Sequence, residues 1–88
     1  MKWATLILLP NHLGYPRLGI SAGRKKLGKA VFRNRAKRRA RELFRRNKHL
    51  LGSHDIVMIL KAPILVMKWQ DIENSYQEAL MTTLNIKK

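Results

Sequence analysis

Residues 29–48 read KAVFRNRAKRRARELFRRNK, and this stretch decides how the rest of the chain must fold. Ten of its twenty residues are Lys or Arg, and Glu42 is the single acid. At the helical spacing of about 100° per residue, the apolar side chains gather on one arc and the cations occupy the remainder. The arc consists of Phe32, Ala36, Ala40, Leu43 and Phe44. The stretch therefore predicts an amphipathic helix whose apolar side, anchored by Phe32 and Phe44, is covered by other elements.

The positive charge is concentrated in one part of the chain. The 88 residues carry a formal net charge of +14, with a pI near 11.3. Residues 17–50 contain fourteen Lys or Arg and one acid, so they hold thirteen of the fourteen net charges. Cations four residues apart on a helix repel each other by roughly a few tenths of a kcal/mol per pair, and a bound polyanion would relieve that repulsion. This balance favours nucleic acid as the partner, with an anionic membrane surface as the competing interpretation.

The flanking segments predict the elements that cover the helix. Residues 2–9 are rich in Ile, Leu and Thr and precede a turn-forming stretch, which is typical of a first strand. Residues 17–23 alternate apolar with small or polar side chains and predict a half-buried second strand. The apolar run at 55–60, DIVMIL, predicts a central strand buried on both faces. Residues 64–67 are expected to form a short edge strand, and the helical spacing of 69–84 predicts a C-terminal helix.

The order strand, strand, basic helix, strand, helix predicts a single α+β domain over residues 1–88. We expect a small two-layer sandwich, in which a mixed central sheet is packed by the long basic helix and by the C-terminal helix. The strand, helix, strand unit predicts a parallel βαβ crossover, because adjacent parallel strands need a long connection. The general expectation for such a crossover is right-handed.

One face of the second strand is nearly bare of side chains. Leu18, Ile20 and Ala22 point one way, and the opposite face includes Gly19 and Gly23. The glycines are consistent with a bulge or a flexible exit from the strand. They are equally consistent with a flat surface that the backbone of an extended ligand can approach closely.

Residues that would support catalysis by the chain itself are missing. There is no cysteine, and the only two acids close in sequence, Asp71 and Glu73, do not face each other on a helix. The three histidines have no metal-ligand spacing, so we expect exposed loop histidines and no metal site. The apolar N-terminal run lacks a signal-peptide cleavage site and is far shorter than the roughly 20 residues of a membrane span. If a reaction is involved, we expect another molecule to perform the chemical step.

One motif allows a comparison with a known family. Arg33-Asn34-Arg35 is followed by Ala36-Lys37-Arg38-Arg39-Ala40-Arg41-Glu42. Leu18-Gly19-Ile20-Ser21 and Lys25-Lys26 precede this core, and Asp55-Ile56-Val57 follows it. In this context of sheet, helix and sheet, the chain resembles the protein subunit of bacterial ribonuclease P from about Tyr15 to the last helix.

The resemblance implies a small basic protein that binds a catalytic RNA and helps it remove the 5′ leader of precursor tRNA. The RNA, with Mg²⁺, performs the hydrolysis, so no catalytic residue, bound metal or small-molecule substrate is expected on the protein. A cytoplasmic location and a left-handed crossover are also implied. The implied RNA contacts are Lys25, Lys26, Lys29, Arg33, Asn34, Arg35, Lys37, Arg38, Arg41 and Arg45. The implied leader contacts are Ser21, Lys25 and Lys26.

Several alternatives remain open at this point. Family members usually begin with a further helix that forms one wall of the leader cleft. The sequence starts at the expected first strand, so we expect either a truncated chain or a variant without that helix. A generic RNA-binding or ribosomal protein would share the charge pattern, as would a cationic membrane-active helix. For single residues, Arg46 and Lys48 are expected to be solvated surface charges. Asn34 would bond either RNA or its own backbone. For Phe32 and Phe44 the alternatives are a core anchor and a base-stacking residue, and we expect core anchors because both lie on or beside the apolar arc.

Overall fold

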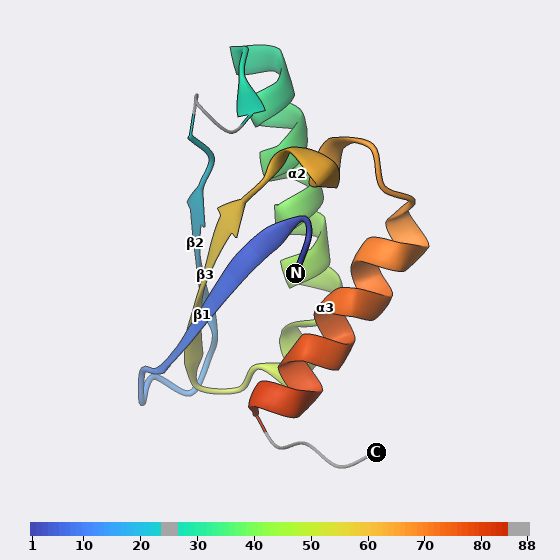
Figure 1. Ribbon diagram of the computed structural model, residues 1–88. Helices are drawn as coiled ribbons and strands as arrows, with labels where there is room; N and C mark the ends of the chain where they lie inside the picture. Colours follow the sequence, from blue (N-terminus) through green and yellow to red (C-terminus); the bar gives the residue numbers. More distant parts are fainter. Residues whose placement is uncertain (24–26, 85–88) are drawn as a thin grey trace.

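The computed structural model describes residues 1–23 and 27–84. In chain order, the elements are β1 (Ala4–Pro10), β2 (Arg17–Ser21), α2 (Ala30–Arg46), the 3-10 helix η1 (Lys48–Leu50), β3 (His54–Leu60), the 3-10 helix η2 (Ala62–Leu65) and α3 (Trp69–Thr83) (Figure 1). Three of the predicted strands and both predicted helices therefore form close to their expected positions. Their apolar periodicity was a sufficient signal because each of them buries one side.

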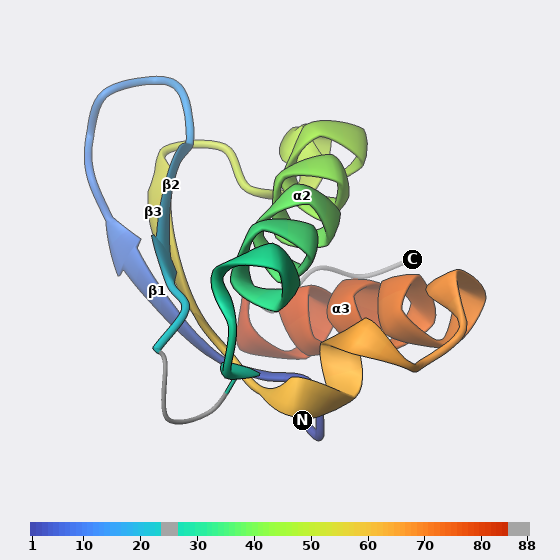
Figure 2. The same cartoon turned by 90° about the horizontal axis from the view of Figure 1, so that it is seen from above.

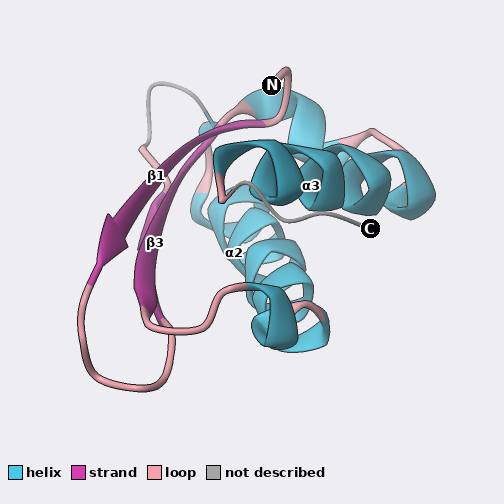
Figure 3. Cartoon of the chain, turned by 90° about the horizontal axis from the view of Figure 1, so that it is seen from below, coloured by secondary structure: helices cyan, strands magenta, loops and turns pink. Residues whose placement is uncertain are grey.

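The three strands form one mixed sheet in the order β1-β3-β2. The central strand β3 pairs antiparallel with β1 and parallel with β2. Both α-helices lie on one side of this sheet, and no described helix covers the other side (Figures 2 and 3). The prediction of a two-layer α+β sandwich with a mixed sheet and a parallel β2–α2–β3 unit is confirmed.

The core lies between the sheet and the two helices. β3 contributes Ile56, Met58 and Leu60, which are fully buried. The helices contribute small and branched apolar residues to the same cluster: Ala36, Ala40 and Leu43 from α2, and Ile72, Tyr76 and Leu80 from α3. Trp3 closes one end of the core, with its ring 6.1 Å from that of Tyr76 in an edge-to-face arrangement. The small side chains of Ala36 and Ala40 let the backbone of α2 approach the sheet closely. The basic helix can therefore pack against a small core.

Two predictions about this layer are wrong. β3 is not buried on both faces, because Val57 and Ile59 alternate with the buried residues and point to the uncovered side. Residues 64–67 do not form a strand, because the 3-10 helix η2 begins at Ala62. Pro63 lacks the N–H that a strand ladder needs and fixes a backbone angle suited to a tight turn. The segment therefore serves as a compact connection into α3.

Candidate nucleic-acid interface

The basic helix α2 begins without a capping side chain. Its N-cap is Lys29, which makes no side-chain cap hydrogen bond. The preceding Gly28 has a positive φ of 76°, a backbone conformation that glycine adopts without strain. At the other end, Arg45 and Arg46 occupy the last turn, where cations interact favourably with the helix dipole. The position of α2 is therefore fixed mainly by its buried side and by contacts along its edges.

The outward face of α2 carries cations that no described residue neutralises. We define this outward face as Asn34, Arg35, Arg38 and Arg41, all of which are exposed. The ion pairs and side-chain hydrogen bonds among the described residues involve none of these four. Asn34 makes no hydrogen bond to its own backbone, which was one of the two alternatives for this residue. Three guanidinium groups are thus presented to solvent on one face, ready to contact phosphates.

Arg33 and Lys37 fall on the flank of α2 opposite to Arg39 at the helical spacing of about 100° per residue. Both are half-buried. The Nε atom of Arg33 is buried and has no hydrogen-bond partner in the described part of the chain. A buried donor without a partner costs free energy. These two residues form the inner margin of the predicted RNA surface.

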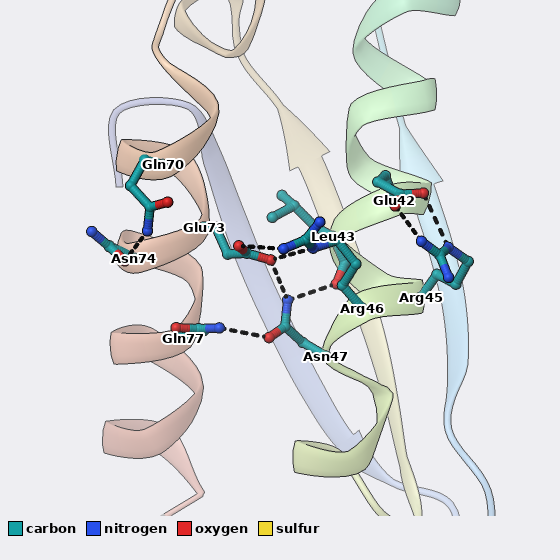
Figure 4. Close-up of polar contacts among 9 residues, drawn as sticks. All are labelled: Glu42, Leu43, Arg45, Arg46, Asn47, Gln70, Glu73, Asn74 and Gln77. Atoms are coloured by element: carbon teal, nitrogen blue, oxygen red, sulfur yellow. Dashed lines mark hydrogen bonds and ion pairs between the residues drawn. The ribbon is translucent and has the colours of Figure 1, made fainter.

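Arg45, also a predicted RNA contact, is paired within the helix. Its guanidinium donates to both carboxylate oxygens of Glu42, with Nε 3.1 Å from Oε2 (Figure 4). This contact holds the pKa of Glu42 below its usual value and raises that of Arg45. Because the pair is exposed, it adds little to stability. Arg45 therefore remains available at the surface, with its charge partly compensated.

Arg39 is directed into the fold and not toward solvent. Its Nη1 atom donates to the carbonyl oxygens of Ile64 and Met67, at 3.0 and 2.9 Å. Both acceptors belong to the segment that contains η2 and leads into α3. Arg39 thus ties the connection between β3 and α3 to the basic helix.

Arg46 is an exposed surface charge, as expected, with its side chain 48% exposed, but the fold also holds it through an ion pair that the sequence did not predict. Its Nε atom donates to Glu73 Oε2 at 2.9 Å, and its guanidinium lies 5.8 Å from the centre of the Trp69 ring. Asn47 is buried beside it and donates to Leu43 O and Glu73, while its own amide oxygen accepts from Gln77 (Figure 4). This network joins the end of α2 to α3. By contrast, Lys48 is exposed, as expected, and lies over the Phe44 ring.

The prediction that Phe32 anchors the core is also wrong. Phe32 is 42% exposed and its neighbour Val31 is 64% exposed, whereas Phe44 packs against the core as expected. The first turn of α2 extends past the ends of β2 and β3 (Figure 1). The sheet therefore does not reach Phe32, although helical spacing places it beside the buried arc.

The uncovered face of the sheet is a second candidate surface. Strand pairing aligns three rows on it: Thr5, Ile59 and Ser21; Ile7, Val57 and Gly19; and Leu9, Asp55 and Arg17. β2 pairs with β3 without interruption, so Gly19 does not mark a bulge. A Cβ atom at Gly19 would meet only Val57, at 3.5 Å, which leaves the space above this strand open. Of the two alternatives for Gly19, the structure favours the flat surface, with the predicted leader contact Ser21 at its end.

A polar network fixes the loop between β1 and β2. Arg17 donates two hydrogen bonds to Asp55, with distances of 2.9 and 2.8 Å. Asn11 donates to Asp55 Oδ1 at 2.9 Å and to the carbonyl oxygen of Tyr15 at 3.0 Å. Hydrogen bonds from Arg17 and Asn11 lower the pKa of Asp55 to about 2. Sequence reasoning missed this network, because its members are distant in the chain and lie together only once β2 and β3 pair.

Comparisons with known proteins agree with this geometry. Residues 1–84 match the family model described as Ribonuclease P. The chain belongs to the ribonuclease P protein family.

Named relatives and solved structures support the assignment to this family. The ribonuclease P protein component of Idiomarina loihiensis is 41% identical over 81 residues, which make up 92% of this chain and 58% of the relative. That of Methylococcus capsulatus is 46% identical over 62 residues, or 70% and 48% of the two chains. The chain thus spans about half the length of these curated relatives.

Two solved structures share the fold. The ribonuclease P protein from Thermotoga maritima superposes with a TM-score of 0.81 at 30% identity, covering 100% of this chain and 81% of that one. The Staphylococcus aureus protein gives a TM-score of 0.77 at 33% identity, with coverage of 94% and 76%. The likeness therefore extends over both layers of the sandwich.

In the ribonuclease P family context, the structure places most but not all predicted site residues. Arg33, Asn34, Arg35, Lys37, Arg38, Arg41 and Arg45 lie on α2, with Lys29 at its N-cap. Ser21 ends β2, on the open side of the sheet. The predicted contacts Lys25 and Lys26 lie outside the described residues. Two separate surfaces result, which are the outward face of α2 and the uncovered face of the sheet.

The described residues also bear on metals and membranes. Within residues 1–23 and 27–84, no group of three or more His, Asp or Glu side chains is placed to hold a metal ion. No helix in the same ranges is long and apolar enough to cross a membrane. Of the predicted loop histidines, His54 instead begins β3, with Nδ1 2.7 Å from the carbonyl oxygen of Leu51.

Proposed function

We propose that this chain acts as the protein component of ribonuclease P and binds the catalytic RNA through the outward face of α2. The observation that carries the proposal is the contrast among the arginines of this helix. Arg35, Arg38 and Arg41 are exposed with no protein partner among the described residues, whereas Arg39 and Arg46 are bonded into the fold. Cations left in this state suit a phosphate backbone, which they would bind with release of counterions. Structured RNA would be recognised mainly through shape, phosphates and 2′-hydroxyls.

The uncovered face of the sheet is proposed to contact the 5′ leader of precursor tRNA. An extended strand of RNA needs a flat track, and Gly19 provides open space between Arg17 and Ser21 along β2. Ser21 would then offer a hydroxyl to the leader, and Lys25 and Lys26 would follow in sequence. Binding energy gained at this face would favour precursor over mature tRNA, because only the precursor has a leader.

In this proposal the protein is a non-catalytic subunit of a ribonucleoprotein endonuclease. Hydrolysis would take place on the RNA, which would hold the Mg²⁺ that the reaction needs. The cations of α2 contribute by bringing the RNA and its substrate together against their mutual repulsion. The work of such a subunit is cytoplasmic tRNA processing. The alternative of a generic or ribosomal RNA-binding protein predicts broad binding and no effect on precursor tRNA.

The test is cleavage of a precursor tRNA by a bacterial ribonuclease P RNA at low Mg²⁺, with and without this protein. We expect the protein to stimulate cleavage, and we expect the double variant Arg38→Ala/Arg41→Ala to need a higher protein concentration for the same stimulation. Lys68→Ala is the matched control, because Lys68 is an exposed cation at the start of α3 that is not a member of the outward face. Tight RNA binding without stimulation would reject the leader role alone. Equal binding to unrelated RNAs would reject the proposed function as a whole.

A further inference from the structure

Phe32 is an exposed aromatic side chain on a helix whose other exposed residues are mostly charged. It is 42% exposed in the first turn of α2, next to Val31, which is 64% exposed. The other aromatic residues near the core are buried or packed against another side chain. Trp3 and Tyr76 are buried, Phe44 packs against the core, and Trp69 lies beneath the guanidinium of Arg46. A single exposed apolar residue needs no explanation, but here two adjacent ones occupy the start of the most basic element.

The neighbours of Phe32 limit what could cover it. Side chains three residues apart lie next to each other on a helix, so Phe32 adjoins Arg35. Arg35 is exposed and makes no ion pair with a described residue. An apolar protein surface laid on Phe32 would also remove the Arg35 guanidinium from water without pairing it, which is costly. A nucleotide satisfies both groups, because its base offers a π face and its phosphate offers a negative charge.

We propose that Phe32 stacks on an unpaired base of the catalytic RNA while Arg35 contacts a phosphate beside it. The inference rests on the proposed function, since it takes the outward face of α2 to be the RNA-binding surface. RNA is read by proteins mainly at unpaired loops and bulges, where bases stack on aromatic rings or guanidinium planes. Stacking tolerates any base, so Phe32 adds affinity at a bulged or looped nucleotide without reading sequence. The arginines supply charge, and Phe32 selects RNA with an accessible base over a plain duplex.

The decisive variants are Phe32→Ala, Phe32→Leu and Phe32→Tyr, assayed for binding to ribonuclease P RNA across a range of salt concentrations. We expect Phe32→Ala to weaken binding about 5- to 150-fold, the range of a lost base–aromatic stack. Phe32→Leu keeps the apolar bulk and loses the ring, so it should weaken binding nearly as much. Phe32→Tyr should retain the affinity. The slope of log affinity against log salt should stay unchanged in all three, because no phosphate contact is removed.

Tyr15 provides the matched control. It is 56% exposed but lies in the loop between β1 and β2, away from the outward face. Tyr15→Leu should leave RNA affinity unchanged, and an equal loss in Tyr15→Leu would overturn the placement of the contact at Phe32. A direct readout comes from Phe32→Trp, whose added fluorescence should be quenched by the RNA beyond any change in the parent protein. Absence of that quenching would also count against stacking.

The remaining outcomes separate this inference from the proposed function. If Phe32→Leu binds like the parent while Phe32→Ala is weakened, the contact is apolar packing and not stacking. If all Phe32 variants bind like the parent while Arg38→Ala is weakened, the stacking inference fails and the RNA surface stands. If Arg38→Ala also binds like the parent, the proposed RNA contact through Arg38 on the outward face fails as well. A large fall in the melting temperature of Phe32→Leu would assign Phe32 to the fold.

Discussion

The outward face of α2 and the edge of the same helix that faces η2 and α3 carry the same residue type in opposite situations. On the outward face, Arg35 and Arg38 are exposed and unpaired among the described residues. On the edge, Arg39 donates to two backbone carbonyls and Arg46 to the carboxylate of Glu73. Arg38 and Arg39 are adjacent in sequence, yet helical rotation directs one to solvent and the other to the connection into α3. Helical position and the acceptors on the facing segment therefore together decide which arginine is left unpaired.

The difference also explains how so basic a helix stays packed on a small core. Glu73 is 6% exposed and receives hydrogen bonds from both Arg46 and the buried Asn47. A buried carboxylate is stable only when it is paired and hydrogen-bonded. Arg39 and Arg46, on the edge, thus attach α2 to the rest of the fold. The unpaired cations remain on the outward face, which a polyanion can reach.

The largest effect is expected from Glu73→Ala, which removes the acceptor at the centre of the edge. Arg46 would lose its partner, and Asn47 would lose one of its hydrogen bonds. We expect the free energy of unfolding to fall by about 2–4 kcal/mol, because three hydrogen bonds to a buried carboxylate are lost and the buried Asn47 amide is left short of one acceptor. Urea denaturation measures the loss. Glu73→Gln, which keeps the shape and an acceptor oxygen, should lose less, and a loss within about 0.5 kcal/mol for both would make this an ordinary surface pair.

Arg39→Ala is expected to have the next largest effect on stability. The variant leaves the carbonyl oxygens of Ile64 and Met67 without their donor. Two hydrogen bonds from a charged donor to partly buried carbonyls correspond to about 1–2 kcal/mol of the unfolding free energy. Binding to ribonuclease P RNA should keep its salt dependence, because Arg39 contacts no phosphate in this arrangement. A salt slope lowered by about one unit would instead place Arg39 with the outward face.

Much of the fold followed from local patterns in the sequence. The apolar alternation of β2 and the helical spacing of α2 and α3 were sufficient, because each element buries one side against the same core. The prediction for residues 64–67 failed because short apolar runs fit either a strand or a turn. What decided the outcome were Pro63 and the distant Arg39, whose two hydrogen bonds hold the segment as part of the connection.

The candidate surface was predictable in outline and less so residue by residue. Clustered cations and the family motif placed Arg35, Arg38 and Arg41 on the outward face. The roles of Arg46 and Phe32 depended on information that helical spacing does not contain. Arg46 needed the position of Glu73 on α3, and Phe32 needed the length of the sheet relative to α2, whose first turn extends past the strands (Figure 1).

Arg38→Ala should weaken RNA binding with little effect on stability, whereas Arg39→Ala should lower stability and leave the salt dependence of RNA binding unchanged. The Arg38 side chain is exposed, so its loss should change the unfolding free energy by no more than about 0.5 kcal/mol. Binding to the RNA should weaken, and the slope of log affinity against log salt should decrease by about one unit for one lost phosphate contact. Lys68→Ala removes the same charge from the start of α3 and should leave the slope unchanged. A large fall in stability with an unchanged slope would mean that Arg38 holds the fold together, as the arginines on the edge do, and does not contact a phosphate.

The smallest effect on stability is expected from substitution of Asp55. Its partner Arg17 is paired, like the arginines on the edge of α2, but lies on the uncovered face of the sheet. Hydrogen bonds from Arg17 and Asn11 hold the pKa of Asp55 at about 2, below its ordinary value of 3.8. A carboxyl whose pKa is lowered by folding stabilises the protein above its unfolded pKa, and this contribution disappears as the pH falls from about 4 toward 2. Asp55→Asn should therefore flatten the acid limb of unfolding free energy against pH in that window, leaving RNA affinity at neutral pH unchanged. Glu78→Gln, at an exposed carboxylate outside these contacts, should keep the limb as it is. An identical acid limb in Asp55→Asn would mean that the exposed pair of Arg17 and Asp55 adds nothing to stability. Among these pairs, only the buried Glu73 on α3 would then stabilise the fold by pairing an arginine.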